Sequence, residues 1–115
     1  MGIHLIKDRI SRTDLQKIAD ERFGDMVKAV VDLTRQVMTL GGELHADEES
    51  EMLERGSMRE DLWGINLYPG EKGDAFIEYD SMINIRPALG NRTRSIDDET
   101  VRAKIRKLVD DMITD

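Results

Sequence analysis

The sequence predicts an α+β domain in which a mostly antiparallel or mixed sheet of about four to six strands carries helices mainly on one face. Three observations predict this class. Strand-like runs follow one another without long intervening helices, two segments repeat apolar residues at helical spacing, and Gly or Pro separates the runs. The chain has 115 residues, a length that suits a single domain spanning 1–115, because one core uses most of the apolar material at this size.

The first 42 residues predict a strand, a helix and a hairpin. Residues 3–6 form a short apolar run, and Ser11 then stands where it can cap a helix that Gly24 ends. Residues 26–32 and 37–40 are rich in β-branched side chains on either side of a polar stretch. We expect them to pair as a β-hairpin that ends at Gly41 and Gly42.

A short acidic helix and a long strand are expected next. Asp47 is a suitable N-cap, acidic residues follow it near the positive end of the helix dipole, and Gly56 is placed to end the helix. Residues 62–68 alternate in polarity, which places three large apolar side chains on one face of a strand: Trp63, Ile65 and Leu67.

The last third predicts one bent strand and one long helix. Residues 76–79 and 82–86 are both strand-like, and the Asp80-Ser81 pair between them suits a bulge within a single strand. Asp97 or Asp98 can cap the final helix, whose apolar stripe indicates packing against the sheet.

Composition limits the classes of function. The net charge is −7 at pH 7, which disfavours binding to nucleic acid or to an anionic membrane. The chain has no cysteine, which excludes disulfides, thiolate catalysis and sulfur-ligated zinc. The sequence shows neither a signal-peptide core nor an apolar run long enough to span a bilayer, so we expect a cytoplasmic protein, and no motif predicts a cofactor.

His45 is the first candidate for chemistry. Imidazole exchanges protons near neutral pH, and His45 stands between Gly41-Gly42 and the start of a predicted helix. Nearby carboxylates, Asp47 among them, could orient the ring. A second histidine at zinc-ligand spacing is missing, so we predict no metal site, and a purely structural role for His45 at the loop or cap remains open.

Arg86, Asn91, Arg92 and Arg94 form the second candidate. Guanidinium groups bind phosphate or carboxylate through paired hydrogen bonds, which makes this segment a candidate anion-binding loop. If 82–86 is a strand, Arg86 and Asn84 point away from the core onto the face that would hold a site. The alternative is that these arginines pair with surface carboxylates.

Three functional hypotheses follow from these residues. The first is binding of an anionic small molecule through the four loop residues with His45 nearby. The second is a hydrolase or nuclease in which His45 is the general acid or base, Asp47 or Asp80 orients it or holds a metal, and the arginines stabilise anionic charge. The third is a homodimer or partner module that uses a free sheet edge or an exposed face containing Tyr68 and methionines.

Four segments also carry a resemblance: residues 21–32, 41–48, 62–69, and 80–87 with Gly90-Asn91-Arg92. They resemble a small prokaryotic family of unknown function, domain-of-unknown-function family 5674. The likeness covers nearly the whole chain. It implies a free-standing cytoplasmic domain, and it brings no activity, cofactor or catalytic residue to these positions.

Overall fold

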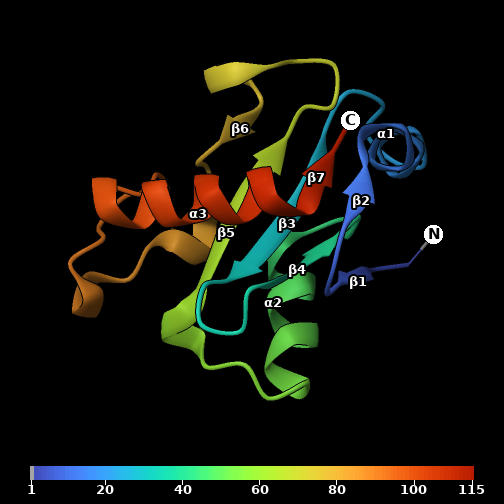
Figure 1. The fold of residues 1–115 in the computed structure, drawn as a ribbon. Helices are drawn as coiled ribbons and strands as arrows, with labels where there is room; N and C mark the ends of the chain where they lie inside the picture. Colours follow the sequence, from blue (N-terminus) through green and yellow to red (C-terminus); the bar gives the residue numbers. More distant parts are fainter. Residues whose placement is uncertain (1) are drawn as a thin grey trace.

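A computed structural model describes residues 2–115 and confirms the α+β class (Figure 1). Five strands form an antiparallel sheet in the order β1-β4-β3-β5-β6, and β2 and β7 form a small parallel sheet. The strands are β1 (His4–Ile6), β2 (Ile10–Ser11), β3 (Val27–Asp32), β4 (Val37–Leu40), β5 (Leu62–Leu67), β6 (Ile77–Glu78) and β7 (Ile113–Thr114). The helices are α1 (Arg12–Asp20), α2 (His45–Glu54) and α3 (Glu99–Met112).

Strand β3 lies at the centre of the sheet. It pairs with β4 through the predicted hairpin and with β5 along its whole length, from Val27 opposite Leu67 to Asp32 opposite Leu62. Its side chains are nearly all buried, as expected for a strand that is covered on both faces.

Helices α1 and α3 cover one face of the sheet, and Figure 1 shows α3 crossing β5 and β3. Ser11 caps α1 and Asp98 caps α3, each by accepting a hydrogen bond from a backbone N–H of the first turn. The apolar stripe of α3 is buried as predicted. This face holds the main core, which includes Leu15, Ile18, Ala29, Val31, Trp63, Ile65, Leu67, Ile105 and Val109.

Helix α2 covers the opposite face. Val30 points there because side chains alternate along β3, and it packs with Met52 of α2 and Leu62 of β5 in a smaller cluster. Two of the three helices therefore share a face, in agreement with the prediction, and α2 lies alone on the other face beside the segment 81–91.

The predicted cap of α2 was wrong. The helix begins at His45, its N-cap is Leu44, and no side chain caps it. Asp47 instead lies within the first turn, where its N–H already donates to the Leu44 carbonyl at 3.1 Å. The earlier start brings His45 against the sheet, which the cap prediction did not anticipate.

The predicted bent strand over 76–86 was also wrong. Only Ile77–Glu78 pairs as a strand, and short 3-10 turns follow at Met82–Asn84 and Pro87–Leu89. The Ser81 hydroxyl accepts from the Ile83 N–H at 3.3 Å and favours the first turn, and Pro87 begins the second. The chain therefore leaves the sheet after β6.

Candidate functional site

The Asn84 side chain bonds to the backbone of β5 at Gly64, where an adjacent strand would otherwise pair. It is fully buried, its side-chain Oδ1 accepts from the Gly64 N–H at 2.8 Å, and its Nδ2 donates to the Gly64 carbonyl at 2.9 Å. An adjacent strand would make the same pair of hydrogen bonds through its backbone. Asn84 therefore points into the protein, contrary to the prediction that it faces a site.

Arg86 likewise bonds to the backbone of β5 in place of a neighbouring strand. Its guanidinium donates to the Leu62 carbonyl and to Glu49 of α2 at 3.1 Å, and it lies 5.3 Å from the centre of the Trp63 ring. Only 11% of the side chain is exposed, and burial lowers the pKa of Arg86 although the Glu49 carboxylate opposes this effect. The predicted solvent-facing orientation was wrong, and the side chain ties α2 to β5.

Asn91 organises the loop that follows. Its Nδ2 shares two N–H groups among the carbonyls of Asn84, Thr93 and Ser95, at 2.8, 3.1 and 2.7 Å, and its Oδ1 accepts from the Asp97 N–H at 2.9 Å. Asn91 and Arg86 also pair through their backbones. The buried side chain of Asn91 thus fixes the path of residues 91–97 from inside.

Arg92 and Arg94 lie on the outside of this loop. Both are exposed. The Arg94 Nε donates to Asp80 at 2.7 Å, and the two side chains are 54% and 43% exposed. No ion pair or side-chain hydrogen bond of Arg92 is found within residues 2–115. The four predicted ligand-binding residues therefore divide into a buried pair and an exposed pair.

His45 is buried at the start of α2, with 7% of the residue exposed. Its Nε2 lies 2.8 Å from the Ile65 carbonyl oxygen, which can only accept, so this nitrogen carries a proton. Burial lowers the pKa of His45, and the hydrogen bond to Ile65 only partly offsets it. The neutral ring consequently leaves Nδ1 as the unprotonated nitrogen.

Asp80 and Arg94 act on His45 only through their charges. Asp80 raises the pKa of His45, and Lys28 and Arg94 lower it, although all three effects are smaller than that of burial. Asp80 bonds Arg94 and makes no hydrogen bond to His45 among the contacts of residues 2–115.

Asp47 lies elsewhere. Residues two apart on a helix do not face each other, and Asp47 is exposed beside a shallow cavity that Gly42 and Arg55 also line. Within residues 2–115, no three His, Asp or Glu side chains gather as a set able to hold a metal ion. The hydrolase or nuclease hypothesis therefore rests on His45 and Asp80, without Asp47 as a partner of the ring.

Glu48 is a buried ionisable residue whose burial was not predicted from the sequence. It is fully buried; its Oε2 accepts from the Gly42 N–H at 3.2 Å, and its Oε1 has no partner within the described chain. Burial raises the pKa of Glu48 well above 4.5. Its spacing from His45 and Met52 could have placed it on the inward stripe of α2.

Comparison with known proteins shows the family. Residues 4–112 match the family model described as "Protein of unknown function (DUF5674)". The chain belongs to this family, as its resemblance indicated. No match was found among curated proteins or among solved structures. Within residues 2–115, no helix is both long enough and apolar enough to cross a membrane.

Proposed function

We propose that this protein is a cytoplasmic domain that binds a small anionic ligand, such as a phosphate-bearing or carboxylate-bearing metabolite, through Arg92 and Arg94. Arg86 and Asn91 hold the loop in place and do not touch the ligand. The observation that carries the proposal is the division of these four residues into two buried scaffold residues and two exposed cations on one loop.

The loop is suited to binding because it is already ordered. The hydrogen bonds of the Asn91 side chain restrain residues 91–97, and the Arg94 carbonyl accepts from the Asn84 side chain at 3.0 Å. A ligand that meets a restrained loop spends less of its binding energy on ordering the loop.

Arg94 can exchange its present partner at small cost. Its ion pair with Asp80 is exposed, and such pairs contribute only about 0–1 kcal/mol to stability. A phosphate or carboxylate that accepts two hydrogen bonds from the guanidinium is a stronger partner than a single carboxylate oxygen.

Thermal unfolding with a panel of anions at constant ionic strength tests the proposal. We expect phosphate or a polycarboxylate to raise Tm in a saturable way, and we expect Arg94→Ala to abolish the shift while the Tm without ligand changes little. Arg9→Ala is the matched control, because Arg9 is exposed on a different segment and its loss changes the net charge equally. If no anion stabilises the wild type, or if Arg94→Ala keeps the full shift, the proposal is wrong.

A homodimeric interaction module is the second candidate, and exposed apolar side chains favour it. Met82, Ile85 and Leu89 are 64%, 38% and 50% exposed on the segment beside α2, and Leu44 at the start of that helix is 56% exposed. Large apolar side chains that gather at a surface often mark a protein contact. Sedimentation equilibrium decides this candidate, since a monomer at every working concentration rejects the homodimer.

A further inference from the structure

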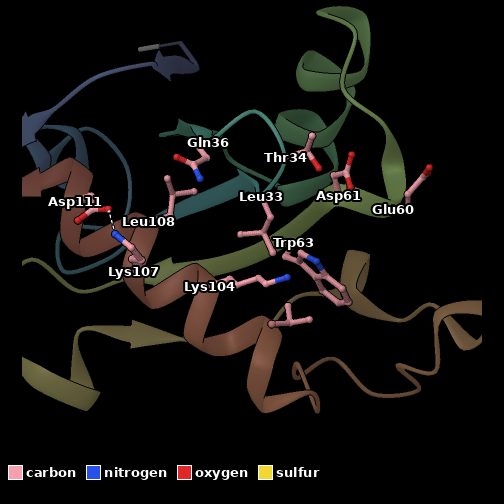
Figure 2. Close-up of a pocket in the computed structure, with 11 residues that line it drawn as sticks. Leu33, Thr34, Gln36, Glu60, Asp61, Trp63, Lys104, Lys107, Leu108 and Asp111 are labelled. Atoms are coloured by element: carbon pink, nitrogen blue, oxygen red, sulfur yellow. Dashed lines mark hydrogen bonds and ion pairs between the residues drawn. The ribbon is translucent and has the colours of Figure 1, made fainter.

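A cavity of about 460 Å³ lies between α3 and the end of the β3–β4 hairpin (Figure 2). Its apolar wall is formed by Leu33, Trp63, Val101 and Leu108. This volume falls within the range of small-ligand sites, which combine an apolar wall with a few polar groups. None of its lining residues belongs to the Arg92 and Arg94 surface.

The charges around the cavity come from two separate elements. Lys104 extends from α3 toward Trp63, whereas Lys107 is joined to Asp111 at 2.8 Å (Figure 2). Glu60 and Asp61 also line the cavity and come from the short turn that precedes β5 (Figure 2). Within residues 2–115, no hydrogen bond or ion pair engages the ammonium of Lys104 or these two carboxylates.

This arrangement selects among ligand charges. A purely anionic ligand meets repulsion from Glu60 and Asp61, and a purely cationic ligand meets repulsion from Lys104. A zwitterion can place its carboxylate at Lys104 and its ammonium at the two carboxylates. Its apolar part can then lie against Trp63 and the neighbouring apolar side chains.

Gln36 of the β3–β4 turn adds a polar side chain to the cavity. It has φ of 57° in the hairpin turn, a conformation that Gly or Asn adopts more easily and that the other side chains rarely take. The turn thus holds the Gln36 side chain at the cavity, where its amide can donate to a carboxylate or accept from an ammonium.

We propose that this cavity binds a small zwitterion with an apolar body, of the chemical class of a free aliphatic or aromatic α-amino acid. Lys104 binds the carboxylate, Glu60 and Asp61 face the ammonium, and Trp63 contacts the apolar body. The proposal is independent of anion binding at Arg92 and Arg94, so either one can fail alone.

Trp63 gives a direct readout because it is the only tryptophan in the chain. L-leucine and L-phenylalanine, titrated to about 20 mM to cover weak affinities, are expected to change its fluorescence in a saturable way. N-acetyl-leucine lacks the positive charge and leucinamide lacks the negative charge. Each is expected to bind at least about tenfold more weakly, the scale of one lost charge-assisted contact.

Two variants and one control complete the experiment. Lys104→Ala is expected to weaken binding by about tenfold, and Gln36→Gly is expected to weaken it while preserving the turn. Lys72→Ala removes the same charge from an exposed position outside the cavity and should bind like the wild type. The proposal is overturned if neither amino acid gives saturable quenching or enhancement, if both analogues bind as tightly as leucine, or if Lys104→Ala binds normally.

Discussion

Burial separates Arg86 from Arg94, although both are arginines of one short segment. The Arg86 side chain is 11% exposed and bonded to Leu62 and Glu49, whereas the Arg94 side chain is 54% exposed and bonded to Asp80. Replacing Arg86 leaves the Leu62 carbonyl and the Glu49 carboxylate without this partner. We therefore expect the free energy of unfolding to fall. Replacing Arg94 removes a solvated pair, so its loss is expected to affect binding more than folding.

Glu48 gives a prediction about pH at the same scale. The pKa of the Glu48 carboxyl is raised well above 4.5 in the folded protein. As pH rises, this carboxyl therefore ionises in the unfolded chain before it ionises in the folded protein. Stability is therefore lost as pH rises from about 4.5 through the folded pKa. Glu48→Gln cannot ionise and keeps an oxygen that can accept from Gly42, so we expect the variant to be more stable than the wild type at pH 7, with the difference shrinking toward pH 4.5.

Urea unfolding of both proteins across this pH range measures the difference. Glu54→Gln is the matched control, because Glu54 is an exposed residue of the same helix. Its unfolding free energy should stay close to that of the wild type across the pH range. A wild type that is more stable than Glu48→Gln at pH 7 would mean that the buried carboxylate has a stabilising partner in solution.

At the scale of elements, the notable feature is the outer edge of β5. The backbone groups of Leu62 and Gly64 on this edge bond to the side chains of Arg86 and Asn84, so no strand pairs with them there. Side-chain amide and guanidinium groups thus complete the sheet while the segment 81–91 turns away from it. This arrangement explains how a polar segment can pack closely on a buried strand.

Close packing at this edge predicts a large effect of Gly64→Ala. An added Cβ would stand 2.6 Å from the Ser81 Cβ and 2.7 Å from its Oγ, and Ser81 is buried. The 81–91 segment would have to shift, at a cost of about 1–3 kcal/mol typical of overpacking. Gly70→Ala adds the same methyl group where nothing lies within 4 Å.

Chemical denaturation of these two glycine variants provides the measurement. We expect a lower midpoint for Gly64→Ala and a nearly unchanged midpoint for Gly70→Ala. Equal midpoints in the two variants and the wild type would show that the segment does not pack tightly on β5.

At the scale of the whole molecule, periodicity predicted most of the fold. The hairpin, the long strand and the helices capped by Ser11 and Asp98 depend on local patterns, and local patterns are visible in a sequence. The run 82–86 was misjudged because Ile83 and Ile85 imitate strand alternation. Its 3-10 geometry depends on the Ser81 cap and on Asn84 bonding to a strand 20 residues away.

The candidate site was only partly predictable for the same reason. The sequence located the polar residues, and the structure pairs Arg94 with Asp80 while His45 bonds the Ile65 carbonyl. The sequence alone could not separate the buried pair, Arg86 and Asn91, from the exposed pair, Arg92 and Arg94. The partners of the buried pair are set by the tertiary fold. Residue type identified the chemistry, and tertiary burial decided which groups can meet a ligand.

The most direct measurement of anion binding is a titration of the ¹⁵N-labelled protein with phosphate, followed by amide chemical shifts. Saturable shifts should centre on Arg92, Arg94 and Asp80, and they should vanish in Arg94→Ala while the rest of the spectrum stays that of the folded protein. Shifts that centre elsewhere, or none up to about 20 mM phosphate, would contradict the assignment of Arg92 and Arg94 as the ligand-binding residues.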